Sequence, residues 1–326
     1  MADPVHAANC SPSWRALARK TSGLLSLSAV LALVVSGCAS PEVVRFPGPT
    51  PVLPEGSREL PMFDGTSGDA VTWDALVQRA LAADVVLIGE LHHHELGMGA
   101  SAALFEDLLA ARPDGPEVAL EFLERDKQPL IDDLADEIIS ERDFVQLARL
   151  SPGNYPWGHR AMVLAAIAAG QPVWAANAPR RYVTLGRKKG YERLAEIPPP
   201  RNALVHTPAF EIGGEYRRRF GVTMNSDQLG DEIVDKFFRS QSLWDATMAD
   251  TVLTAVKGGA SPIVLVIGRF HIAHDGGTLQ RIKAANSSLN VLTVAIDDSH
   301  AERLAADDVG LAQVVIYAGN FPDPQQ

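Results

Sequence analysis

The sequence predicts an α/β fold in which a mainly parallel sheet is flanked by helices. Three observations lead to this prediction. Short runs rich in β-branched residues alternate with longer stretches of helical periodicity along most of the chain. Several of these runs are continuously apolar, which is typical of strands buried on both faces of a parallel sheet. One region, residues 180–225, breaks the alternation and predicts an inserted loop or small helical subdomain.

The expected elements follow from these patterns in chain order. Strands are expected at residues 84–88, 117–122, 172–176, 262–267, 291–296 and 314–317. Helices are expected at residues 96–111, 125–149, 158–169, 226–257 and 277–285. Parallel strands joined by right-handed crossovers have their carboxyl ends at one edge of the sheet, where ligands bind in such folds.

The composition is that of an ordinary globular protein, with 46% hydrophobic and 21% charged residues among 326. The chain has 40 acidic and 29 basic residues, so its net charge is −11. A nucleic-acid-binding protein needs a basic footprint on its surface. The sequence therefore predicts no nucleic acid partner.

The N-terminal segment has the pattern of a secretory signal. Arg15, Arg19 and Lys20 precede an apolar stretch at 23–35, and Cys38 follows small residues in a pattern that resembles a bacterial lipobox. We expect a lipoprotein-type signal peptide at 1–37, lipidation at Cys38, and anchoring in the bacterial cell envelope, at the periplasmic face of the outer membrane. The alternative is an ordinary signal whose cleavage site precedes a cysteine.

A proline-rich segment separates this signal from the predicted domain. Residues 38–62 contain six prolines and little periodicity. We therefore predict an extended tether at 38–74 and a folded domain at 75–326. Beyond Cys38 the chain has no cysteine, so disulfides and thiolate ligands are excluded from that domain.

Two similar motifs follow two of the predicted strands. "VVLIGELH" (85–92) and "IVLVIGRFH" (263–271) are both apolar runs that end in Gly-x-x-His. A glycine permits a sharp exit from a strand, after which the histidine can turn back over the sheet edge. His92 and His271 are therefore expected on the same edge of the sheet.

Acidic residues occur at the same strand ends. Glu90 lies within the first motif, and Glu121 lies near the end of the strand "VALEFLE". A glutamate at the end of a buried strand is costly unless it is paired or bound to a metal. Glu90, His92, Glu121 and His271 could therefore ligate a divalent metal ion, or serve as base and electrophile in hydrolysis. Alternatively, the glutamates cap helices and hydrogen-bond to the histidines.

Four motifs carry a resemblance to a known family. "GELH", "LEF", "PVWAANAPR" and "QSLWDATMAD", in this order, resemble the ChaN-like haem-binding lipoproteins, which are grouped with the Tiki and TraB proteins and the erythromycin esterases. The resemblance covers roughly residues 75–320. It implies a parallel α/β sheet, haem as the ligand, a role in haem or iron uptake or storage, a haem receptor as partner, and a homodimer that holds haem between its protomers through tyrosine with help from histidine.

The family's haem ligands carry over to this chain as candidates. His159 stands where relatives are expected to have the tyrosine, and Tyr155 lies four residues earlier. Histidine is also an ordinary haem ligand. Arg180, after a strand end, could pair with a haem propionate. Together with the motif histidines, the candidates for haem binding are His159, Tyr155, His92, His271 and Arg180. His93, His94 and His274 are expected to be ordinary polar residues.

The sequence therefore leaves two candidate functions. The first is a membrane-anchored haem-binding protein without catalysis. The second is a metal-dependent peptidase or esterase that uses Glu90, His92, Glu121 and His271. The resemblance favours haem.

Overall fold

The computed structural model of the chain describes residues 46–321. The predicted signal peptide, Cys38 and the first part of the predicted tether lie outside these residues. Within them, no helix is both long and apolar enough to cross a membrane.

The described residues form one sheet of seven strands in the order β1-β7-β6-β2-β5-β3-β4. Only β1 runs antiparallel to its neighbour in this sheet. The strands are β1 (Met62–Asp64), β2 (Val85–Glu90), β3 (Glu117–Glu124), β4 (Val173–Asn177), β5 (Ile263–Gly268), β6 (Val291–Asp297) and β7 (Val314–Tyr317).

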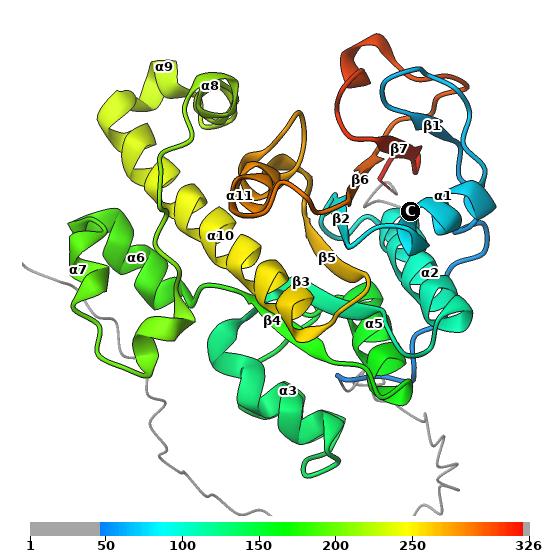
Figure 1. The fold of residues 1–326 in the computed structure, drawn as a ribbon, viewed down its shortest axis with the longest axis horizontal. Coiled ribbons are helices and arrows are strands. Elements are labelled where there is room, and N and C mark those ends of the chain that lie inside the picture. Colours follow the sequence, from blue (N-terminus) through cyan, green and yellow to red (C-terminus); the bar gives the residue numbers. More distant parts are fainter. Residues whose placement is uncertain (1–45, 322–326) are drawn as a thin grey trace, which may run out of the picture. The chain divides into compact units, whose positions relative to one another are not determined.

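Helices cover both faces of this sheet (Figure 1). They are α1 (Trp73–Leu81), α2 (Glu95–Ala111), α3 (Gln128–Ala135), α4 (Glu141–Leu147), α5 (Trp157–Ala168), α6 (Arg180–Lys189), α7 (Glu192–Ala195), α8 (Gly214–Thr223), α9 (Ser226–Leu229), α10 (Asp231–Gly258) and α11 (Gly277–Ala285). Short 3-10 turns are η1 (Arg125–Lys127), η2 (Arg201–Leu204), η3 (Arg269–His271) and η4 (Ala306–Asp308).

Alternate residues of the central strands bury against different helices. Val86 and Ile88 of β2 face the core formed with α1, α2 and α5. Val85 and Leu87 face the core formed with α10 and α11. This alternation follows from the two-residue period of a strand. Since both faces are covered, β2 is apolar at each of its first four positions, as the sequence predicts for a buried parallel strand.

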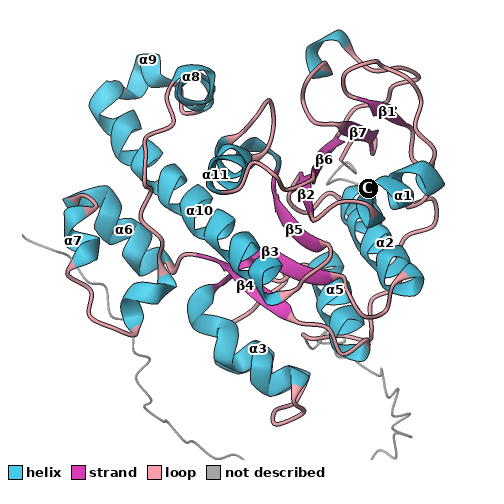
Figure 2. Ribbon diagram, in the orientation of Figure 1, coloured by secondary structure: helices cyan, strands magenta, loops and turns pink. Residues whose placement is uncertain are grey.

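The predicted elements are confirmed, with shifted ends and two helices divided. The expected helix at 125–149 consists of η1, α3 and α4, because Pro129 favours a helix start and Ser140 caps α4 with a reciprocal hydrogen bond to Asp143. The expected helix at 226–257 is interrupted at Gly230, which has a φ of 78°. In Figure 2, α9 lies at the upper end of the long helix α10, and α3 lies below β4 in this view.

The inserted region at 180–225 is helical. Of the two predicted alternatives, a loop or a small helical subdomain, the structure shows the helical subdomain. Its helices α6 and α7 enclose a small core with α10, formed by residues such as Tyr182, Leu194 and Leu243. Helix α8 packs through Tyr216 and Phe220 onto the first half of α10. The region therefore extends the helical layer on the α10 side of the sheet.

The described part of the predicted tether, residues 46–74, differs from the extended form expected for 38–74. The Phe46 ring packs edge-on against Tyr155, with centroids 6.4 Å apart. The Arg160 guanidinium binds the carbonyl oxygens of Gly48 and Pro49. Strand β1 pairs with β7. Proline-rich backbone has few N–H donors, but its carbonyl groups still accept, and a buried arginine holds them against the domain.

Candidate functional site

The two Gly-x-x-His motifs lie beside each other at the carboxyl end of the sheet. Strands β2 and β5 are parallel neighbours, and Glu90 is the register partner of Gly268. A Cβ atom at Gly268 would lie 3.2 Å from Nε2 of His92, so the absence of a side chain lets the imidazole rest against the backbone of β5. The structure therefore brings the two motifs to one site.

Glu90 joins two histidines from different elements. Its Oε1 atom accepts a hydrogen bond from Nδ1 of His92 at 2.9 Å, and its Oε2 atom accepts one from Nε2 of His159 at 2.8 Å. Glu90 and His159 are buried, whereas the His92 side chain is 42% exposed. Burial raises the pKa of Glu90, but the charge and hydrogen bond of His159 and the hydrogen bond of His92 outweigh it and lower the pKa to about 2.

His271 lies between two carboxylates. Its Nδ1 atom donates to Oδ1 of Asp245 at 2.6 Å, and its Nε2 atom lies 3.6 Å from Oε1 of Glu121. The other oxygen of Glu121 accepts the backbone N–H of Gly268 at 2.5 Å. Burial lowers the pKa of His271, but the charges of Asp245 and Glu121 outweigh it and raise the pKa to about 10. His271 is therefore a buried cation at neutral pH.

Further polar groups fix Asp245 in place. Its oxygens also accept hydrogen bonds from the hydroxyls of Thr278 and Tyr216, each at 2.8 Å. Gln241, one helical turn before Asp245 on α10, donates to the Tyr216 hydroxyl at 2.9 Å. None of Asp245, Gln241 and Tyr216 is among the site residues predicted from the sequence. The sequence did contain a signal for two of them, because Gln241 and Asp245 are four residues apart and therefore lie on the same face of the predicted helix.

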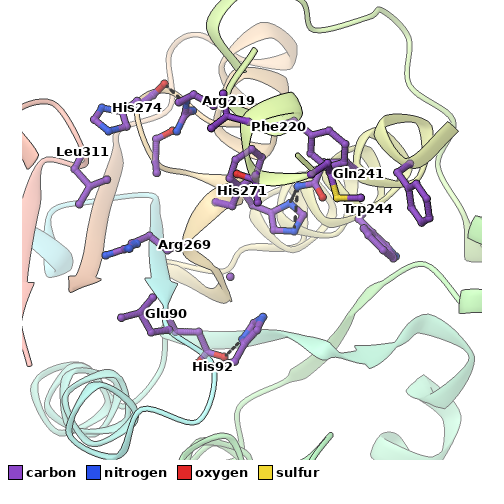
Figure 3. A pocket seen from close by; sticks show the side chains of 18 of the residues that line it. Glu90, His92, Arg219, Phe220, Gln241, Trp244, Arg269, His271, His274 and Leu311 are labelled. Atoms are coloured by element: carbon purple, nitrogen blue, oxygen red, sulfur yellow. Dashed lines mark hydrogen bonds and ion pairs between the residues drawn. The ribbon is translucent and has the colours of Figure 1, made fainter. Parts of the chain in front are cut away.

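A cavity of about 850 Å³ opens above these groups (Figure 3). Glu90 and His92 lie on one side of the close-up, and His271, Gln241 and Trp244 lie on the other. Much of the wall is apolar and comes from Leu91, Phe220, Met224, Phe237, Trp244 and Phe270. Three arginines also line it: Arg218, Arg219 and Arg269. The cavity thus combines an aromatic wall with positive charge.

His274, which we expected from the sequence to be an ordinary polar residue, also lines this cavity. His274 and Asp275 both have left-handed backbone conformations, with φ values of 47° and 55°. The loop is held by a hydrogen bond from the His274 N–H to the Leu311 carbonyl at 3.0 Å and by Arg219, which donates to the Ala273 carbonyl at 2.6 Å. Burial and the charge of Arg219 lower the pKa of His274. Its imidazole is therefore neutral at neutral pH.

Three predicted haem-binding residues lie away from the cavity. His159 is 1% exposed and lies behind Glu90. Tyr155 is buried between the rings of Phe46 and Phe144. Arg180 begins α6 with an exposed side chain, and its backbone N–H donates to Glu124. Of the five predicted haem-binding residues, the cavity wall contains His92 and His271.

The four residues predicted as metal ligands gather at this site but face one another. Within residues 46–321, no group of three or more His, Cys, Asp or Glu side chains has an arrangement that could hold a metal ion. Both oxygens of Glu90 accept from imidazoles, and Glu121 is engaged by Gly268 and His271. The geometry therefore agrees with the alternative in which the glutamates hydrogen-bond to the histidines, and it does not favour the hydrolase.

Comparison with known families decides the assignment. The family described as "Haem-binding uptake, Tiki superfamily, ChaN" matches residues 76–282, more than half of the chain. This chain belongs to the ChaN family. The resemblance seen in the four sequence motifs is thereby confirmed. No curated protein shows a significant match to the chain.

One solved structure shows the same fold, and two others align less well. The structure described as "Cofacial heme binding to ChaN of Campylobacter jejuni" aligns with a TM-score of 0.61 and 18% identity, over 79% of this chain and 96% of that one. The type III effector HopBA1 aligns with a TM-score of 0.42 and 15% identity, over 76% and 93%. The erythromycin esterase EreC in its open conformation aligns with 0.42 and 12%, over 75% and 79%. At these identities the first alignment confirms the α/β fold of the ChaN family.

Proposed function

We propose that this ChaN-family protein binds haem in the 850 Å³ cavity at the carboxyl ends of β2 and β5 and takes part in haem or iron uptake or storage. The observation that supports this most directly is the composition of the cavity wall. It offers an apolar surface, arginines and an accessible imidazole in one space, at the sheet edge where ligands bind in parallel α/β folds.

The cavity residues fit the chemistry of haem. The macrocycle is flat and apolar, and a cavity of this size is within the range of small-molecule sites. Phe220, Trp244 and Phe270 supply aromatic wall. The propionates are anionic and pair with guanidinium groups, which Arg219 and Arg269 supply at the same cavity. When bound, haem would supply a redox-active iron that requires an axial ligand from the protein.

His274 is the residue best suited to that ligand. His271 holds its Nδ1 proton against Asp245 and directs Nε2 at Glu121, so neither nitrogen has a free lone pair. His92 donates Nδ1–H to Glu90; burial lowers the pKa of His92, but the hydrogen bond to Glu90 and the charge of Glu121 outweigh burial and raise it, which favours the protonated ring. In the described part of the chain, His274 has no carboxylate within ion-pair distance. A neutral imidazole without such a partner keeps a lone pair for iron.

The remaining parts of the proposed function rest on the sequence and on one solved structure. Residues 15–38 support a lipid anchor at Cys38 and a location in the bacterial envelope, at the periplasmic face of the outer membrane. The ChaN protein of Campylobacter jejuni binds haem cofacially, which supports a homodimer of this chain that holds two haems face to face. A haem receptor would deliver or accept this ligand.

A haemin titration tests the proposal. The protein without residues 1–38 should give a saturable Soret band that differs from that of free haemin. His274→Ala should shift the band and weaken binding, whereas His300→Ala, an exposed histidine away from the cavity, should leave both unchanged. A His92→Ala variant that alters the band while His274→Ala does not would transfer the ligand role to His92. Failure of the wild type to bind haemin at micromolar concentration would refute haem binding.

A further inference from the structure

The wall of the cavity proposed for haem is positively charged, although the chain as a whole has a net charge of −11. Within residues 46–321, Glu90 is the one acid that lines it, and both of its oxygens accept hydrogen bonds from imidazoles. The arginines in this wall are Arg218, Arg219 and Arg269. Much of the remaining wall is apolar and includes Phe220, Trp244 and Phe270. A wall of this kind favours an anionic ligand with an apolar body.

Two of these arginines have hydrogen-bond donors left for a ligand. The half-buried Arg219 binds the carbonyl oxygens of Ala273 and His274 through Nη2, and its Nη1 atom makes no hydrogen bond in the described part of the chain. Arg269 binds Asp297 through Nη1, and 26% of its side chain is exposed. Its Nε and Nη2 atoms make no hydrogen bond with residues 46–321. Both arginines can therefore donate hydrogen bonds to propionate groups.

The iron-binding capacity of the same wall is small. Of the groups that line the cavity in the described chain, Glu90 has both oxygens engaged by imidazoles, and His271 is a cation held between two carboxylates. His92 donates to Glu90 and favours its protonated form. Met224 offers a soft thioether, which is a poor ligand for ferric iron. The part of the binding that is specific to iron therefore consists of one imidazole, that of His274.

A single iron–imidazole bond discriminates weakly between haemin and a porphyrin without metal. The bond replaces one between the iron and water, so its net contribution is a difference between two bonds, as for a hydrogen bond exchanged with water. Protoporphyrin IX has the same apolar macrocycle and the same two propionates as haem, but it lacks the iron. It also lacks the positive charge of the ferric centre, which the arginines of the wall repel. The apolar and ionic contributions to binding therefore do not depend on iron.

We propose that the cavity accepts dianionic porphyrins as a class, and that it binds metal-free protoporphyrin IX as well as haem. Arg219 and Arg269 bind the propionates, and the aromatic side chains of the wall contact the macrocycle. His274 contributes to affinity when the porphyrin carries iron and is dispensable when it does not. The inference rests on the proposed function, since both ligands occupy the same cavity.

Two titrations of the haem-free protein without residues 1–38 test this inference, one with protoporphyrin IX followed by porphyrin fluorescence and one with haemin followed by the Soret band. Wild type should bind protoporphyrin IX saturably, with a Kd within about tenfold of that for haemin. Haemin should displace bound protoporphyrin IX, because the two ligands share one cavity. His274→Asn should weaken haemin binding about tenfold and leave the Kd for protoporphyrin IX unchanged. Asparagine is chosen because it tolerates the left-handed backbone of this position, where φ is 47°.

Arginine variants complete the comparison. Arg219→Ala should raise both Kd values about tenfold, whereas Arg303→Ala, an exposed arginine outside the cavity, should change neither. If wild type binds haemin but binds protoporphyrin IX more than about tenfold more weakly, the inference is overturned and the haem proposal stands. Equal losses of both ligands in His274→Asn would also overturn it, because the imidazole would then not be specific to iron. If wild type binds neither ligand, the haem proposal itself fails.

Discussion

Nδ1 of His271 lies 2.6 Å from Oδ1 of Asp245, and both side chains are buried beneath the cavity. The two residues come from η3 and from the middle of α10, so this pair joins the second Gly-x-x-His motif to the long helix. With Glu121 on its other side, the imidazole is held as a cation whose orientation is fixed by two carboxylates.

Removal of Asp245 should strongly destabilise the protein. Asp245→Ala leaves the buried His271 cation and the Tyr216 hydroxyl without their main acceptor, and breaking a buried pair costs about 3–5 kcal/mol. Urea unfolding followed by circular dichroism measures this change in the free energy of unfolding. Asp235→Ala, which removes an exposed partner of Arg217, should cost about 0–1 kcal/mol. Equal losses in the two variants would contradict the role assigned to Asp245.

The stability of the protein should fall as the pH rises towards 10. Folding raises the pKa of His271 from its ordinary value of 6.5 to about 10. The contribution of protonated His271 to the free energy of unfolding is therefore complete below pH 6.5 and is lost as the pH rises through about 10. Urea midpoints measured between these pH values should decline for wild type more than for His271→Gln, which cannot titrate. Parallel declines in the two proteins would show that His271 contributes nothing to the slope.

Glu90 should stabilise the protein down to very low pH. Folding lowers its pKa from 4.5 to about 2 through His159 and His92. The stabilisation is present above pH 4.5 and is lost as the pH falls through about 2. Glu90→Gln lacks this contribution, so it should unfold at a higher pH than wild type in an acid titration monitored by tryptophan fluorescence. Glu95→Gln, an exposed acid at the start of α2, serves as the control and should unfold with wild type.

Arg219 should contribute to haem affinity, if the proposed function is correct. It lines the cavity and fixes the loop that carries His274 by binding the Ala273 carbonyl. Arg219→Ala should raise the Kd for haemin about tenfold, which corresponds to about 1.4 kcal/mol. Arg303→Ala, an exposed arginine outside the cavity, should not change it. An unchanged Kd in Arg219→Ala would exclude this arginine from the haem site.

The sequence by itself determined the fold class and the edge of the sheet that carries the site. Continuous apolar runs such as 85–88 and 263–267 specify buried strands, because helices pack on both faces of the sheet and side chains on both faces must therefore be apolar. Parallel pairing then places Glu90 and His92 beside Gly268 and His271. These are local patterns joined by a general rule of topology, and the order of the four motifs was sufficient to indicate the ChaN family.

Only the tertiary structure decided which partners each of these side chains has. Asp245 meets His271 across 26 positions of sequence and His159 meets Glu90 across 69, so no local pattern encodes either pair. The same is true of residues 46–74, which lie on the domain because Arg160 donates hydrogen bonds to the carbonyls of Gly48 and Pro49 and because β1 pairs with β7. His274 lines the cavity because a left-handed loop is fixed by α8 and the β6–β7 connection. Side-chain orientation at a strand end depends on long-range packing, which sequence periodicity does not specify.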